Sequence, residues 1–130
     1  WQNGHEMSNI ETARDRFDDA LRELARKDAS ITFFDDRTWF HSKWGSRDSR
    51  GDPAFGVVSI GSSIHIVHAI GDSPDNTVLA DQHAGLAYNT LWCQAIVDVL
   101  ATRLGLPIRP ISAVEVEEFL APRFRAAGLL

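Results

Sequence analysis

The chain has 130 residues and carries 13 basic and 18 acidic side chains, which gives a formal net charge of −5. This length is typical of one domain, and an apolar fraction of 44% is that of a folded globular protein rather than a disordered one. The acidic balance argues against general binding to nucleic acids or anionic membranes, which usually requires net positive charge. We expect one domain over residues 7–130, preceded by residues 1–6 as a cloning remnant or a disordered segment.

The single cysteine, Cys93, excludes an intramolecular disulfide and a multi-cysteine metal site. Its neighbours have the pattern of a buried helix face, so we expect a structural rather than a reactive thiol. No apolar run approaches the roughly 20 residues that span a bilayer. No basic-then-apolar signal segment is present at the start of the sequence. We therefore expect a cytoplasmic protein without membrane contact.

The first predicted element is a helix over residues 9–27. Ser8 and Glu11 have the spacing of a capping box, in which each side chain satisfies a backbone N–H at the start of a helix. Apolar side chains then recur at helical spacing and form one stripe: Ile10, Ala13, Phe17, Leu21 and Leu24. The opposite face is charged, which is typical of a helix that packs on one side.

A β-hairpin is predicted next. Residues 30–34 and 38–44 are rich in β-branched and aromatic side chains, and residues 35–37 have the composition of a turn. The alternation of a strand over 38–44 places the side chains on two faces: Trp39, His41 and Lys43 on one, and Phe40, Ser42 and Trp44 on the other. A polar loop over residues 45–53 follows.

A second hairpin is predicted from residues 54–60 and 63–70, with Gly61 and Ser62 as a two-residue turn. In this register Val57 lies opposite Ile66. Neither face of the pair is cleanly polar, so we expect helices on one face and further chain or a partner on the other.

Two helices complete the predicted fold. The first covers residues 82–104 and ends at Gly105, and the second begins at Ser112, which forms a capping box with Glu115. Pro122 is expected to kink or split the second helix. The order of elements predicts an α+β fold, with a four-stranded antiparallel meander flanked by an N-terminal helix and two C-terminal helices.

Residues 37–50 form the strongest candidate contact surface in the sequence. They contain four basic residues and one acidic residue, a local charge of +3 in an acidic chain, and aromatic side chains lie between the charges. Arginine and aromatic residues are enriched at binding sites. The predicted binding residues are Arg37, Trp39, His41, Lys43, Trp44, Arg47 and Arg50.

A second candidate is a site for a divalent metal ion, which imidazole and carboxylate groups could bind. The predicted ligands are His68, Asp72, Asp81 and His83. His65 is excluded because residues three apart on a strand point to opposite faces. The alternative is that the aspartates serve as turn and cap residues and that His83 is solvated.

The sequence contains no coherent catalytic set, so the leading hypothesis is a small, soluble, non-catalytic protein-binding module without a cofactor. Such a module could be of the inhibitor, immunity or accessory type, and its partner could be another protein or a second copy. The alternatives are a metal-assisted hydrolase or nuclease using the His/Asp cluster, and single-stranded nucleic-acid binding through residues 37–50.

Overall fold

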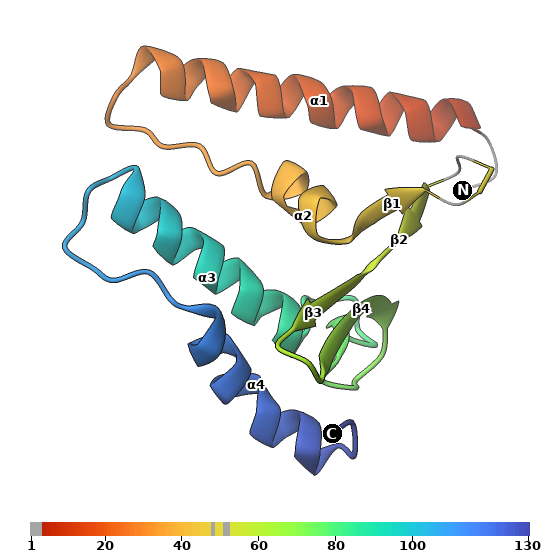
Figure 1. Cartoon of the computed structure of the whole chain (residues 1–130). Coiled ribbons are helices and arrows are strands. Elements are labelled where there is room, and N and C mark those ends of the chain that lie inside the picture. The colour runs from red at the N-terminus through yellow and green to blue at the C-terminus, as the bar shows by residue number, and fades with distance from the viewer. Residues whose placement is uncertain (1–3, 48, 51–52) are drawn as a thin grey trace. The chain divides into compact units, whose positions relative to one another are not determined.

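The computed structural model describes residues 4–47, 49–50 and 53–130, with side chains described for residues 9–45, 49–50 and 54–130. The chain divides into two compact units, one up to Asp35 and one from Asp36 to Leu130. The elements are α1 (Gly4–Lys27), α2 (Asp36–Trp44), β1 (Gly45–Arg47), β2 (Pro53–Phe55), β3 (Val57–Ile60), β4 (Ile64–Ile70), β5 (Asn76–Val78), α3 (Leu86–Thr102) and α4 (Ala113–Ala126) (Figure 1). The fold is therefore α+β, as predicted, whereas the single domain over residues 7–130 stays a prediction.

The predicted N-terminal helix is confirmed, but it is longer than expected. It begins at Gly4, so Ser8 and Glu11 lie inside α1 and the capping box predicted at its start is wrong. Residues 4–6 belong to this helix, and residues 1–3 lie outside the described part of the chain.

Arg22 connects α1 to the segment that follows it within the first unit. Its guanidinium group pairs with Asp19 at 2.7 Å and with Asp35, and it lies 5.6 Å from the centre of the Phe33 ring. The segment after the helix therefore folds back against the Arg22 side of α1.

The largest departure from the predicted fold is α2. Residues 38–44, predicted as a strand, are helical, and residues 30–34 belong to no strand. A strand would also place Phe40 and Trp44 on one face, but roughly 13 Å apart. A helix sets them one turn apart, so that their rings can touch, and this contact overrides the β-propensity of the aromatic residues. Trp44 is fully buried, and the ring centres of Phe40 and Trp44 are 5.2 Å apart.

The second hairpin is confirmed with a register that differs by one residue. Val58 pairs with Ile66 and Ile60 pairs with Ile64, so the turn has three residues rather than two. Gly61 has the positive φ expected of the turn (59°). A one-residue shift in register moves the side chains of one strand to the opposite face of the pair. In the observed register Ile60, Ile64 and Ile66 therefore share one apolar, buried face. The other face is open, with Val57 56% exposed and a hydrogen bond of 3.0 Å between Ser59 and His65.

The predicted four-stranded antiparallel meander is not formed. The strands make one mixed sheet in the order β3-β4-β5, with β5 parallel to β4, and a separate antiparallel pair of β1 and β2. Five residues connect β4 to β5, although parallel neighbours usually need about a dozen or more. Five residues are enough here because β5 has only three residues, so the connection has to bring the chain back by only roughly 10 Å along β4.

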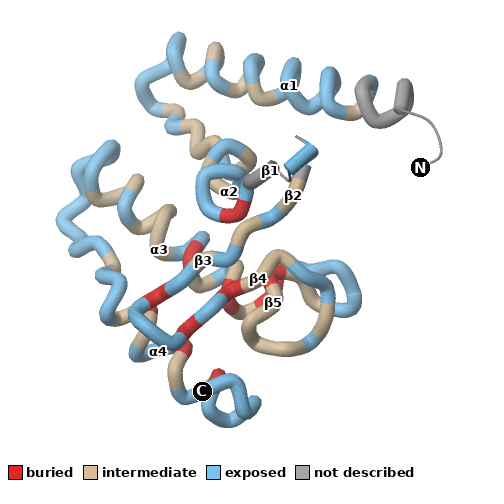
Figure 2. The backbone as a smooth tube through the Cα atoms, turned by 45° about the vertical axis from the view of Figure 1, so that its right-hand side comes forward, coloured by how far each residue is buried: buried red, intermediate tan, exposed pale blue. Residues whose placement is uncertain are grey.

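The core lies between the buried face of β3 and β4 and the two C-terminal helices (Figure 2). The strands contribute Ile60, Ile64 and Ile66, α2 contributes Trp44, α3 contributes Ala87 and Leu91, and α4 contributes Val116, Leu120 and Phe124. Helix α3 ends shortly before Gly105, whose φ of 62° is left-handed, as the glycine stop predicts. Helix α4 runs through Pro122 to Ala126, so the proline does not split the helix.

We predict that Trp44→Ala destabilises the protein by about 3–5 kcal/mol, the usual cost of truncating a buried tryptophan. The substitution also removes the hydrogen bond that the Trp44 indole N–H donates to the Ile66 carbonyl at 3.3 Å. Urea unfolding measures the loss. The matched control is Trp92→Ala, because Trp92 is 38% exposed, and its loss should be much smaller. Equal losses for the two variants would contradict the placement of Trp44.

Candidate functional site

The two tryptophans of the predicted contact surface belong to an aromatic core. Trp44 is buried, and the Trp39 ring meets the Trp44 ring edge-on at 5.8 Å and the Tyr88 ring at 5.5 Å. Trp44 and Tyr88 are stacked at 5.9 Å. Burial, and secondly the charge of Asp36, raise the pKa of Tyr88. These contacts give both tryptophans a structural role.

The predicted row of Trp39, His41 and Lys43 on one strand face is wrong, because the segment is helical and successive side chains are turned by about 100°. His41, Lys43 and Arg50 are exposed and Arg37 is half-buried. The side chain of Arg47 lies outside the described side chains. Binding by these basic residues stays a prediction, without the aromatic row that motivated it.

His68 lies among aromatic rings rather than beside the other predicted metal ligands. Its Nδ1 shares a hydrogen bond of 2.7 Å with Thr77 Oγ1, and its ring centre is 4.1 Å from that of Phe55 and 4.9 Å from that of Phe40. Burial lowers the pKa of His68. The structure therefore favours a neutral imidazole that packs within the fold.

The remaining predicted ligands serve the loops that carry them. Asp72 accepts a hydrogen bond from the Ala80 backbone N–H at 3.1 Å. Asp81 accepts one from the His83 backbone N–H, and its other oxygen lies 3.1 Å from His83 Nδ1. Within residues 4–47, 49–50 and 53–130, no three His, Cys, Asp or Glu side chains form a group that could hold a metal ion. The metal site stays a prediction that these contacts do not favour.

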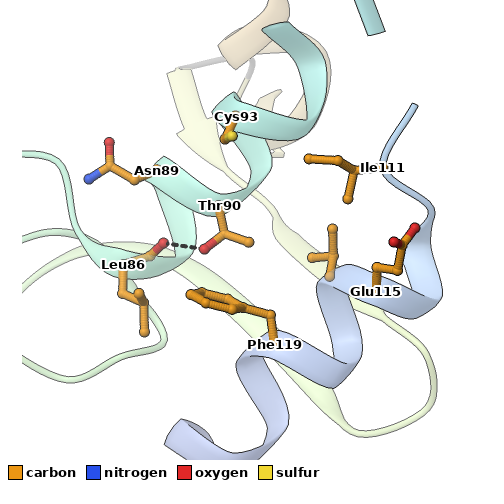
Figure 3. A pocket seen from close by; sticks show the side chains of 8 residues that line it. Leu86, Asn89, Thr90, Cys93, Ile111, Glu115 and Phe119 are labelled. Carbon is orange, nitrogen blue, oxygen red and sulfur yellow. Dashed lines mark hydrogen bonds between the residues drawn. The ribbon is translucent and has the colours of Figure 1, made fainter. Parts of the chain in front are cut away.

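A groove lies between α3 and α4 in the second unit (Figure 3). Its volume is about 500 Å³, within the usual range of ligand and peptide pockets. Helix α3 supplies Leu86, Asn89, Thr90 and Cys93, the connecting segment supplies Ile111, and α4 supplies Glu115, Val116 and Phe119. The lining is predominantly apolar.

The polar side chains around the groove are bound to the backbone. The Thr90 hydroxyl donates to the Leu86 carbonyl at 2.8 Å (Figure 3), and the Asn89 amide donates to the Ala84 carbonyl at 2.9 Å. Gln94 donates to the Ile111 carbonyl at 2.9 Å and so attaches the connecting segment to α3. These bonds hold the walls of the groove in place.

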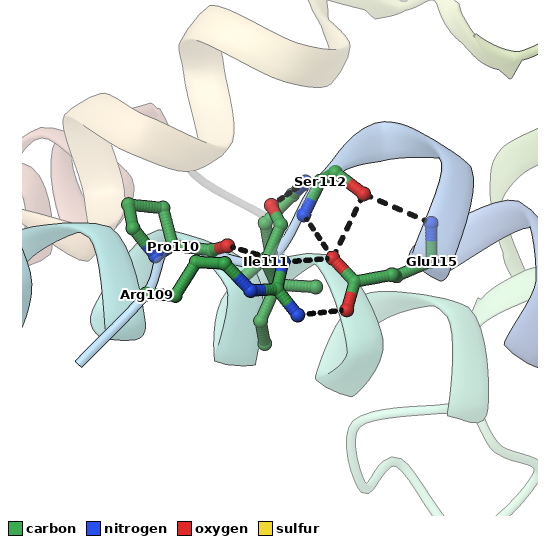
Figure 4. Close-up of polar contacts among 6 residues, drawn as sticks. Arg109, Pro110, Ile111, Ser112 and Glu115 are labelled. Carbon is green, nitrogen blue, oxygen red and sulfur yellow. Dashed lines mark hydrogen bonds and ion pairs between the residues drawn. The ribbon is translucent and has the colours of Figure 1, made fainter.

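Glu115 joins the start of α4 to the connecting segment (Figure 4). It completes the predicted capping box: Ser112 Oγ accepts from the Glu115 backbone N–H at 3.2 Å, and the Glu115 carboxylate accepts from the Ser112 backbone N–H at 2.9 Å. Arg109 donates to both carboxylate oxygens at 2.6 Å each. The bonds from Arg109, and then those from Ser112, hold the pKa of Glu115 well below its ordinary value of 4.5. The charged, fully bonded carboxylate is therefore a structural clamp.

Cys93 is exposed on the groove, so the predicted buried thiol is wrong. The sequence carried a signal for this placement. Leu86, Asn89, Thr90 and Cys93 recur at intervals of three and four residues, which puts them on one helix face of mixed polarity. That face lies beside the purely apolar stripe, and the groove appears only once α4 packs next to it.

No family model, curated protein or solved structure matches this chain. Among the helices of the described residues, none is both long and apolar enough to cross a membrane.

We predict that Glu115 makes the stability of the protein dependent on acidic pH. Because its pKa is lowered in the folded state, its contribution is complete above the unfolded value near 4.5 and is lost as the pH falls below it. The difference in unfolding free energy between the wild type and Glu115→Gln should therefore shrink between about pH 6 and about pH 3. In an Arg109→Gln background the same difference should vary less with pH. A difference that does not change with pH would contradict the clamp.

We also predict that Cys93 reacts with a thiol reagent such as dithionitrobenzoate in the native protein. The thiol is exposed, so its rate should lie within about tenfold of the rate in the unfolded chain. The release of thionitrobenzoate, followed with and without urea, gives both rates. A thiol that reacts only after unfolding would contradict the exposed position of Cys93 and support the original prediction of a buried, structural thiol.

Proposed function

We propose that the chain is a small, non-catalytic protein-binding module and that the α3–α4 groove receives an apolar segment of a protein partner. The observation that carries this proposal is the apolar lining of the groove, formed by Leu86, Ile111, Val116 and Phe119. A segment with apolar side chains at helical spacing would bury them against these residues, as amphipathic helices do in other hydrophobic grooves.

A protein partner is favoured over a small molecule because apolar exposure extends well beyond the groove. The same two helices and the segment between them carry several large, exposed apolar side chains: Trp92, Leu104, Leu106, Ile108, Val114 and Phe119. Exposed apolar surface that extends over several elements is typical of protein contacts. A ligand that only filled the groove would leave most of these side chains in water.

The polar groups of the groove support binding rather than catalysis. The Glu115 carboxylate is bonded to Arg109 and Ser112 and stays ionised, so it is poorly suited to donate a proton. The Thr90 hydroxyl donates a hydrogen bond to the Leu86 carbonyl. Their partners among the described residues include a backbone carbonyl for Thr90 and a guanidinium group for Glu115, and neither of these is a base that would activate a nucleophile.

The test uses a displayed library of amphipathic helical peptides, panned against the full chain. We expect selected peptides whose Kd rises at least about tenfold in Phe119→Glu, because a charge replaces one apolar wall of the groove. Val57→Glu is the matched control, since it puts the same charge on an exposed apolar position of the open sheet face. Peptides that bind Phe119→Glu as well as they bind the wild type would contradict the proposal.

A further inference from the structure

Helix α1 carries a mainly apolar seam in which Phe17 and Leu24 are exposed and Ile10 and Leu21 are half-buried. The seam positions alternate in steps of four and three residues, the spacing of coiled-coil core positions: Ile10, Arg14, Phe17, Leu21 and Leu24. Phe17 is 64% exposed and Leu24 is 49% exposed. Large apolar side chains at this spacing are typical of a helix that packs against another helix.

The segment that follows α1 is attached to the other side of the helix. Its contacts with Asp35 and Phe33 are made by Arg22. Arg22 and Leu24 are two residues apart, and two residues turn a helix by about 200°. The return segment therefore lies on the side of α1 opposite Leu24 and leaves Leu24 exposed, whereas Leu21, next to Arg22, is half-buried.

The same helix from a second copy of the chain matches this seam when the two run antiparallel. In a parallel, in-register pair, Arg14 would face Arg14 of the second copy and repel it. In an antiparallel pair with Ile10 opposite Leu21, the register sets Arg14 opposite Phe17. There the guanidinium group can lie on an aromatic face, an attractive contact.

The charges along α1 favour the same orientation. Residues 9–19 contain four acidic and two basic side chains, whereas residues 20–27 contain three basic and one acidic. Antiparallel pairing sets the negative half of each helix beside the positive half of the other, and parallel pairing sets like beside like. For a pair of α1 helices, the polar position in the seam and the charge distribution thus both favour the antiparallel direction.

We infer that α1 is a self-association element, which pairs antiparallel with α1 of a second copy through the seam from Ile10 to Leu24. This surface is separate from the α3–α4 groove, so the inference does not depend on what the groove binds. A single helix pair buries little surface, and the dimer is expected to be a weak one.

Sedimentation velocity of the full chain, from about 1 to about 500 µM, tests the association. The inference predicts a dimer at the upper concentrations, and a rise of at least about tenfold in the dimer Kd for Phe17→Asp and for Leu24→Asp. Thr12→Asp is the matched control, because Thr12 is exposed and turned by about 140° from Phe17. Circular dichroism of each variant confirms that α1 stays helical. A monomer at all concentrations, or an equal loss in Thr12→Asp, would overturn the inference.

The direction is tested with a nitroxide label at Lys27→Cys in a Cys93→Ser background. In the antiparallel register the two labels are separated by about 35 Å along the helix axis, at 1.5 Å per residue, whereas a parallel pair brings them within roughly 15 Å. Double electron–electron resonance distinguishes these distances. A short distance would overturn the antiparallel pairing.

Discussion

The burial of Trp44 is the constraint on which the second unit depends. Its indole ring packs against Phe40 and Tyr88, and its N–H donates to Ile66 in the central strand. Its own carbonyl accepts a hydrogen bond of 2.7 Å from Gly56, between β2 and β3. One side chain thus connects α2, α3 and the sheet, and it explains why a segment with strand-like composition is helical.

The groove is a consequence of how α3 and α4 share one face of a small sheet. Leu91 and Ala87 from α3 and Val116, Leu120 and Phe124 from α4 are used in the core. The neighbouring faces of the two helices are then left to line a hollow, and the Arg109–Glu115 clamp and the Gln94 bond to Ile111 fix the chain that closes one end of it. The lining of this hollow is predominantly apolar, and its Asn89, Thr90 and Glu115 side chains are bonded within the protein.

Sequence reasoning succeeded for two helix boundaries that local rules define, although the capping box at Ser8 was wrong, and it failed where tertiary contacts decide. The capping box at Ser112 and the glycine stop at Gly105 depend on neighbouring residues, and both are confirmed. Residues 38–44 were wrongly predicted as a strand because β-propensity takes no account of the core that Phe40 and Trp44 share. The nine residues of α2 also make too few turns for a clear helical period. The register of the second hairpin was wrong by one residue because the length of the turn, not its glycine, sets it. The groove forms only when α3 and α4 pack beside each other, and that packing is a tertiary contact that no local pattern specifies.

The most direct test of the binding role is photo-crosslinking from the two rival surfaces in an extract of the cells that make the protein. One sample carries a benzophenone at Cys93, on the groove, and the other carries it at Lys43→Cys in a Cys93→Ser background, on α2. The groove account predicts one saturable protein adduct from Cys93 that disappears in Phe119→Glu, and none from position 43. An adduct from position 43 alone would contradict the groove account and would support binding through the basic segment at residues 37–50.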